Sequence, residues 1–161
     1  MQQSSGRIQK RIIEFMIFHR NSTCLLHIEP NEDRNLVTNK AITASSNKEN
    51  EHRYKLLFGL LFSMRSFVKQ VSPPNCTDGL KSFSTPAYKV HYEEFLNGLR
   101  FVLITVPMKK DLGDEMRKIF ENFYTTMISK NVFTNTDEQI KNEIFIDMVN
   151  NYLITLNKII Q

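Results

Sequence analysis

The sequence predicts an α+β domain in which helices cover both faces of an antiparallel sheet. Residues 12–18 and 100–106 form nearly continuous apolar runs rich in β-forming side chains, which is typical of strands covered on both faces. Three further segments carry apolar residues at helical spacing. Asn97-Gly98 lies between two strand-like segments, and this dipeptide is a strong hairpin signal. The predicted order of elements is ββαβββαα.

The composition fits one globular domain spanning residues 1–161. Hydrophobic residues make up 41% of the chain and charged residues 24%, which allows a buried core. The net charge is +4, yet the longest basic runs are pairs such as Lys10-Arg11. Because phosphate binding needs clustered lysine and arginine, nucleic acid is not an expected partner. Residues 1–7 carry no pattern, and we expect them to be disordered or a remnant of cloning.

The two cysteines and the longest apolar run bear on the cellular setting. Cys24 and Cys76 belong to no CxxC motif or framework spacing, so a reduced cytosolic protein is the simplest expectation, with a disulfide left open. The longest apolar run, 56–62, is far shorter than the roughly 18 residues of a membrane span. We therefore expect no transmembrane segment.

The first third of the chain predicts a hairpin followed by a loop. Strand 12–18 leads through a polar turn at 20–23 into strand 24–28, which Pro30 ends. Residues 31–50 are rich in Asn, Ser, Thr and charged side chains, with few apolar residues to offset the entropy of ordering. We expect this segment to be a mobile loop.

Residues 51–71 predict a helix that the prolines at 73–74 end. Its apolar side chains cover an arc of roughly 240° on the helical wheel, more than a helix resting on one core needs. We expect one stripe to face the sheet, namely Leu57, Leu61, Met64 and Val68. We expect a second stripe to bind a partner protein, namely Leu56, Leu60, Ser63 and Phe67. The alternative is that the 31–50 loop and the strand predicted over 80–85 cover this second stripe.

The second half predicts three strands and two helices. Strands are expected over 80–85, 88–95 and 100–106, with a two-residue Asn97-Gly98 turn in which both residues have positive φ. One helix is expected over 112–127 with Asp111 as its N-cap. The last helix is expected over 140–159, after a Thr136-x-x-Gln139 capping box. Its predicted core stripe is Ile140, Ile144, Met148, Tyr152, Leu156 and Ile159.

Signatures of catalysis and metal binding are largely absent. The chain contains no GxGxxG, GxxxxGK[ST], HExxH or GxSxG motif. Cys24 and His27 are three residues apart on a predicted strand, so their side chains should point to opposite faces and share no metal ion. We therefore expect no catalytic residue, no cofactor and no metal site.

One predicted strand carries side chains that could serve as acid or base. His91 lies on the same strand face as Lys89 and Glu93, but no nucleophile accompanies it, so a solvated face is favoured over a general base. Glu93 and Glu94 should point to opposite faces and cannot act as paired carboxylates. An enzyme using His91 remains a remote alternative.

The predicted first long helix carries a family resemblance. Residues 54–68, YKLLFGLLFSMRSFV, resemble the helix motif of the small sybindin-like subunits of TRAPP, the transport protein particle. The similarity continues through Ser72-Pro73, Asp78-Gly79, the Leu80-x-x-Phe-x-Thr85 pattern, residues 88–92 and Asn97-Gly98. Residues 17–20 resemble the family's opening hairpin, with His19 in place of the usual acidic residue. From residue 131 onward the resemblance is faint.

The resemblance implies a longin-like (profilin-like) fold, with a five-stranded antiparallel sheet, one helix on one face and two on the other. It also implies a non-catalytic core subunit of a vesicle-tethering complex that promotes nucleotide exchange on a Rab GTPase in endoplasmic reticulum to Golgi transport. The implied partners are a related longin-like subunit and, through the assembled complex, the GTPase. The implied location is cytoplasmic, peripheral at endoplasmic reticulum and Golgi membranes.

An alternative within the same fold is a longin-type regulatory or adaptor domain in another vesicle-trafficking complex, because one fold hosts several functions. A SNARE would carry a coiled-coil segment after the longin domain, and the sequence given ends at Gln161.

Overall fold

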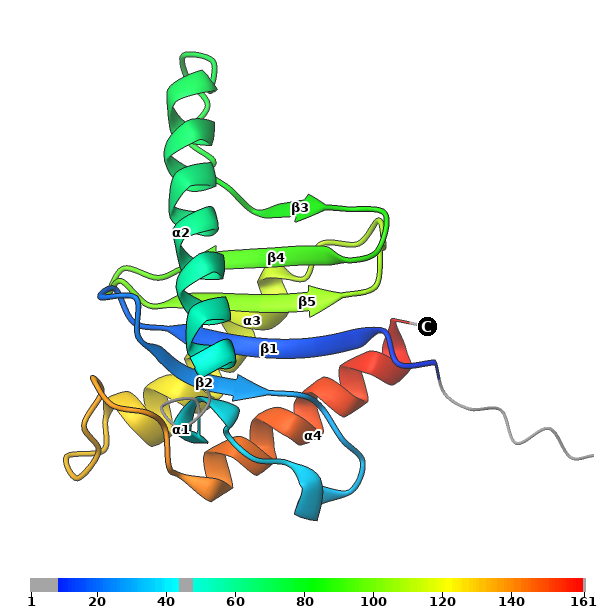
Figure 1. The fold of residues 1–161 in the computed structure, drawn as a ribbon, viewed down its shortest axis with the longest axis vertical. Helices are drawn as coiled ribbons and strands as arrows, with labels where there is room; N and C mark the ends of the chain where they lie inside the picture. Colours follow the sequence, from blue (N-terminus) through cyan, green and yellow to red (C-terminus); the bar gives the residue numbers. More distant parts are fainter. Residues whose placement is uncertain (1–8, 44–47, 161) are drawn as a thin grey trace, which may run out of the picture.

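The computed structural model describes residues 9–43 and 48–160. These residues form a five-stranded antiparallel sheet in the order β2-β1-β5-β4-β3, with helices on both faces (Figure 1). The strands are β1 (Ile12–Phe18), β2 (Cys24–Ile28), β3 (Ser82–Ser84), β4 (Lys89–Glu94) and β5 (Arg100–Thr105). The predicted α+β arrangement is confirmed. The expectation of disorder at 1–7 concerns residues outside the described part of the chain.

The helical segments differ in length and in the face they cover. They are η1 (Arg34–Leu36), α1 (Lys40–Thr43), α2 (Lys48–Val71), α3 (Gly113–Ile119), the π-helix η3 (Phe120–Ser129) and α4 (Glu143–Ile159). In Figure 1, α2 crosses one face of the sheet and extends beyond β3, while α3 lies behind the sheet and α4 runs below β2. Helices α3 and α4 share the core on the face opposite α2. Within the described residues, no helix is both long and apolar enough to span a membrane.

Two hydrophobic cores lie on either side of the sheet. The larger core joins the sheet to α3, η3 and α4 through residues that include Phe15, Leu25, Phe101, Met116, Tyr124 and Phe145. The smaller core joins it to α2 through residues that include Met16, Phe18, Tyr54, Leu61 and Val102. Strands β1 and β5 are paired on both sides and contribute to both cores, as their continuous apolar runs predict.

The segment 31–50 differs from the loop that the sequence predicts. It contains η1, α1 and the first turn of α2, and Asn39 is buried within it. The side chain of Asn39 makes four hydrogen bonds to backbone groups, two of them on β2. This buried amide anchors the segment, and Ala41 and Val37 add apolar contacts with the two cores. The mobility of the segment stays a prediction, and 44–47 lie outside the described residues.

The turn between β4 and β5 is one residue longer than predicted. The Phe95 N–H donates to Leu99 O at 2.9 Å, which leaves Leu96, Asn97 and Gly98 in the loop. The Gly98 N–H donates back to Phe95 O at 2.9 Å, and Gly98 rather than Asn97 has a positive φ, of 85°. This pattern is a type I turn followed by a left-handed glycine, so the predicted two-residue turn with two positive φ values is wrong.

The helix caps also differ from the predictions. Asp111 does not cap α3: its carboxylate pairs with Lys89, and Leu112 precedes the helix without a side-chain hydrogen bond. The helix α4 begins at Glu143 with Asn142 as its N-cap, so the predicted capping box at Thr136 is not used. At α3 the ion pair with Lys89 takes the place of the predicted cap, and at α4 a nearer asparagine does so.

The buried face of α4 is rotated from the predicted stripe. Its buried apolar residues are Phe145, Ile146, Val149, Leu153 and Leu156. The predicted core residues Ile144, Met148 and Ile159 are exposed instead. Two asparagines lie on the same buried side and are hydrogen-bonded: the Asn150 amide pairs with the Asn31 backbone, and Asn157 Oδ1 accepts the N–H groups of residues 11 and 12. Periodicity alone cannot distinguish these two apolar stripes.

The predicted solvated face of β4 is buried. His91 is 1% exposed because the loop leading into α3 folds over it. Its Nδ1 accepts the Leu112 N–H at 3.3 Å, and its Nε2 lies 3.1 Å from Thr105 Oγ1. The Lys89 ammonium, which the sequence also places on a solvated face, is buried and donates to Asp111. Burial, reinforced by the Lys89 charge, lowers the pKa of His91 to about 4.

This shift predicts acid sensitivity. In the unfolded chain His91 takes up a proton near its ordinary pKa of about 6.5, whereas the folded protein resists protonation until about pH 4, so acid favours unfolding between these values. From about pH 7 to about pH 5, we expect the free energy of unfolding to fall by about 2 kcal/mol more in the wild type than in His91→Gln. Urea denaturation at both pH values measures this difference, and equal losses would contradict it.

Candidate partner-binding surface

The long helix α2 has a sheet-facing side and an exposed side, and the predicted sheet-facing stripe is confirmed in part. Leu61 is buried and Leu57 half-buried in the core under the helix, whereas Met64 and Val68 are half-buried and do not belong to that core. Leu56, Leu60 and Phe67 are 61%, 47% and 65% exposed. Ser63 is also exposed. The space beside Gly59 is open, because a Cβ added there would meet no atom within 4 Å. The exposed stripe of Leu56, Leu60, Ser63 and Phe67 therefore leaves an apolar surface open to a partner.

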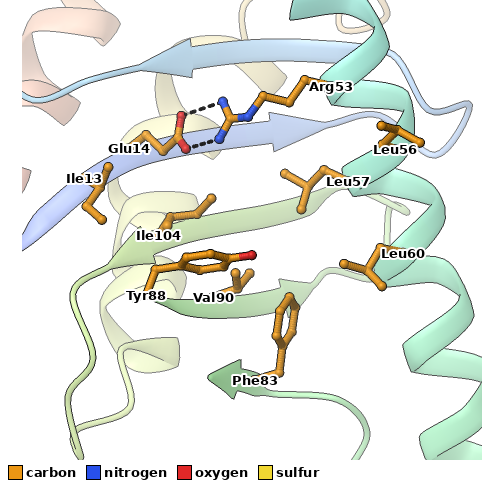
Figure 2. A pocket seen from close by; sticks show the side chains of 10 residues that line it. All are labelled: Ile13, Glu14, Arg53, Leu56, Leu57, Leu60, Phe83, Tyr88, Val90 and Ile104. Carbon is orange, nitrogen blue, oxygen red and sulfur yellow. Dashed lines mark hydrogen bonds and ion pairs between the residues drawn. The ribbon is translucent and has the colours of Figure 1, made fainter. Parts of the chain in front are cut away.

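The exposed stripe borders a groove of about 430 Å³ between α2 and the sheet. Figure 2 shows its side chains: Leu56, Leu57 and Leu60 from α2, and Ile13, Phe83, Tyr88, Val90 and Ile104 from the sheet and its loops. The walls are mainly apolar, and Glu14 and Arg53 form one polar end. Because Leu60 and Phe83 line the same groove, the helix stripe and strand β3 belong to one continuous surface.

A hydrogen-bonded cluster of Glu14, His27, Arg53 and Tyr54 attaches α2 to β1 and β2. Arg53 donates both terminal nitrogens to the Glu14 carboxylate, with Nη1 3.0 Å from Oε2 (Figure 2). His27 Nε2 lies 2.7 Å from Glu14 Oε2, and His27 Nδ1 lies 2.6 Å from Tyr54 Oη. These side chains come from three elements that are distant in the sequence, and short motifs give no signal for their meeting.

The electrostatics of this cluster suit anchoring rather than catalysis. Burial alone would raise the pKa of Glu14, but the hydrogen bonds from His27 and Arg53 and their charges outweigh it and lower that pKa to about 2. Burial raises the pKa of Tyr54, so its hydroxyl is a poor nucleophile. Each group already has a partner within the cluster, and the arrangement fixes the helix on the sheet.

The predicted separation of Cys24 and His27 is wrong. Phe18 pairs with Cys24 while Ile17 pairs with Leu26, so Leu25 is an extra residue on β2 and forms a β-bulge. Cys24 and His27 consequently lie on the same face, the one covered by α2. Burial nevertheless raises the pKa of Cys24, whose Sγ donates to Leu26 O at 3.3 Å, and such a thiol is a weak metal ligand.

Glu14, His27 and Glu29 are close enough together to suggest a cation site. Their potential ligand atoms lie within 4.8 Å of one another. However, Glu14 is paired with Arg53 and Glu29 with Lys40, the latter at 2.6 Å. A divalent ion would have to displace two positive side chains, so the geometry does not favour a metal.

Glu93 and Glu94 point to opposite faces, as predicted. Glu93 pairs with Arg117 of α3 at 3.4 Å, and Glu94 pairs with Arg65 of α2 at 2.5 Å. The two carboxylates therefore serve separate helices and cannot cooperate in acid-base chemistry.

The two edges of the sheet differ in how they are covered. At the β2 edge, Asn39 Oδ1 accepts the His27 N–H at 2.9 Å and its Nδ2 donates to Leu25 O at 2.8 Å. The Ile140 N–H also donates to Leu25 O, at 2.9 Å. At the other edge, β3 pairs with β4 alone within the described residues. Strand β3 therefore offers a free edge, which is a template for pairing with another chain.

Comparisons with known proteins give a consistent family. The Sybindin-like family model matches residues 12–156. The chain is 29% identical over 144 residues to Trafficking protein particle complex subunit 1 of Dictyostelium discoideum, covering 88% of this chain and 94% of that protein. It is 32% identical over 140 residues to the Rattus norvegicus protein of the same name, covering 87% and 90%.

Two further similarities are to proteins of the same complex under other names. Trafficking protein particle complex subunit BET5 of Saccharomyces cerevisiae is 29% identical over 126 residues, covering 78% of this chain and 77% of that protein. Trafficking protein particle complex subunit 4 of Pongo abelii is 29% identical over 92 residues, covering 56% and 42%.

The two sides of α2 should respond differently to substitution. Leu61→Ala removes a buried side chain and should lower the free energy of unfolding by about 2 to 5 kcal/mol. Leu60→Asp changes an exposed residue and should leave it within about 0.5 kcal/mol of wild type. Chemical denaturation of both variants measures the contrast. A Leu60→Asp chain as unstable as Leu61→Ala would mean that the stripe is part of the core.

Proposed function

Because the chain belongs to the Sybindin-like family, we propose that it is a core subunit of the trafficking protein particle complex and corresponds to subunit 1. The relatives with that name align over about nine-tenths of both sequences. The single structural observation that carries the proposal is the continuous apolar surface formed by the exposed α2 stripe, the groove and the free β3 edge.

The first partner we propose is a related longin-like subunit of the same complex. Subunit 4 shares part of this sequence, which supports a partner with a similar helix and sheet. The exposed stripe offers apolar side chains for helix packing, and β3 offers backbone groups for strand pairing. Docking through both elements would bury the exposed apolar stripe of α2.

The second part of the proposal is that the assembled complex promotes nucleotide exchange on a Rab GTPase in endoplasmic reticulum to Golgi transport. Exchange requires tighter binding of the nucleotide-free GTPase than of its GDP-bound form, and differential affinity of this kind needs no general base. The commitment of Glu14, His27 and Tyr54 to one another is compatible with such a non-catalytic role. The subunit would then reach endoplasmic reticulum and Golgi membranes as a peripheral part of the complex.

Stopped-flow release of a fluorescent GDP analogue from the matching Rab GTPase tests this proposal. The arms are buffer, this chain alone, the other core subunits without it, the full set, and the full set containing Leu60→Asp. We expect acceleration in the full set and the buffer rate with this chain alone. The Leu60→Asp set should behave as the set without this chain, because the charge disrupts an apolar interface.

Two outcomes would contradict the proposal. Acceleration by this chain alone at micromolar concentration would show that exchange does not depend on assembly. Full activity in the set that omits the chain would show that the subunit is not needed for exchange.

A further inference from the structure

The flank of α2 opposite the groove covers a buried arginine. Arg100 begins β5, beside the turn that joins it to β4, and is 7% exposed. Its guanidinium carbon lies 4.6 Å from the centre of the Phe58 ring and 5.9 Å from that of Phe62, both on α2. Phe62 is the outer ring of the two and is 49% exposed.

The hydrogen bonds of this guanidinium are incomplete. Nε and Nη1 of Arg100 are buried and donate to no group in the described part of the chain. Nη2 lies 3.8 Å from Glu94 Oε1, which is an ion-pair separation beyond hydrogen-bond range. Arg65 and the Tyr92 hydroxyl contact the other oxygen of this carboxylate, Oε2, at 2.5 Å and 3.2 Å. Arg100 therefore shares Glu94 with Arg65 and has no carboxylate to itself among the described residues.

An arginine in this state is costly for the isolated chain. A buried cation loses its hydration, and unused donors add to that loss unless a partner compensates. The two aromatic faces offset part of the cost through cation–π attraction. An apolar side chain of similar length would avoid the remainder, so folding alone does not account for an arginine here.

The surroundings of Arg100 are positive and partly apolar. Arg65 and Arg100 both face the single carboxylate of Glu94, which leaves these three side chains a net charge of +1. Leu96, in the turn between β4 and β5, is fully exposed. A cation bordered by exposed apolar side chains is a common composition of interface hot spots.

We propose that Arg100 binds an aspartate or glutamate side chain of a protein partner that docks on this flank of α2, with the Phe62 ring moving aside to admit it. The carboxylate accepts the Nε–H together with the neighbouring N–H of Nη2, the two donors on one side of the guanidinium, and its charge balances the local excess. One carboxylate matches such a pair of donors, whereas a phosphate brings a larger charge and more acceptor oxygens than this enclosure serves. That the partner is a neighbouring subunit rests on the proposed function, and this second site is separate from the groove.

The binding chemistry is tested on the isolated full chain by NMR, with the arginine Nε–H groups labelled. The probe is a capped Leu-Glu-Leu tripeptide, and a capped Leu-Gln-Leu tripeptide is the matched control. We expect millimolar glutamate peptide to shift the Arg100 Nε–H and Phe62 ring resonances, and the glutamine peptide to leave them in place. An equal response to both peptides, or no response to either, overturns the inference.

The role in assembly is tested with Arg100→Met and with Arg117→Met as the control, since Arg117 pairs with Glu93 on the other face of the sheet. We expect Arg100→Met to unfold at or above the denaturant midpoint of wild type, and to bind at least one neighbouring subunit about tenfold or more weakly. Wild-type affinity of Arg100→Met for every neighbour overturns the inference. Failure of the wild-type chain to bind any subunit counts against the proposed function, and the peptide titration then decides the Arg100 site by itself.

Discussion

A single helix, α2, covers one face of the sheet, and the dimensions of helix and sheet do not match. The 24 residues of α2 give it a length of about 36 Å, whereas five strands span only about 19 Å, so α2 extends beyond β3. In the direction of the strands the sheet is the larger of the two, because a seven-residue strand is about 23 Å long and a helix is about 10 Å wide. One helix therefore leaves part of this face uncovered. The groove beside Leu60 and the exposed stripe both result from this mismatch. The opposite face, covered by α3, η3 and α4, holds the larger core.

Polar contacts position α2 where apolar burial is small. Only Tyr54 and Leu61 of the helix are fully buried, so the cluster of Glu14, His27, Arg53 and Tyr54 determines where its N-terminal half lies on β1 and β2. A buried ion pair of this kind adds specificity of placement more than net stability. Since Asn39 and Ile140 cover the β2 edge, β3 is left as the edge to which a partner can add.

Local patterns in the sequence predict the elements well and their tertiary partners poorly. The continuous apolar runs of β1 and β5, the exposed side of α2 and the end of that helix at Val71 agree with the structure, because each depends on periodicity or on proline chemistry. The exposed stripe was predictable for the same reason, although its binding role is a proposal. The predictions for His91 and Cys24 were wrong because an overlying loop and a β-bulge decide them. The predicted face of α4 was wrong because the helix carries two apolar stripes, and the buried one also holds two hydrogen-bonded asparagines. The Glu14 cluster and Arg100 depend on contacts between distant segments, for which a single sequence carries no local signal.

We propose that the exposed stripe of α2 and the free β3 edge form one docking surface. Hydrogen–deuterium exchange of this chain, alone and bound to a related longin-like subunit, tests it most directly. We predict that binding slows amide exchange in β3 and in the part of α2 around Leu60, while exchange in β2 stays unchanged because its edge is already covered. Protection confined to β2 or α4, with β3 and α2 unaffected, would contradict the account.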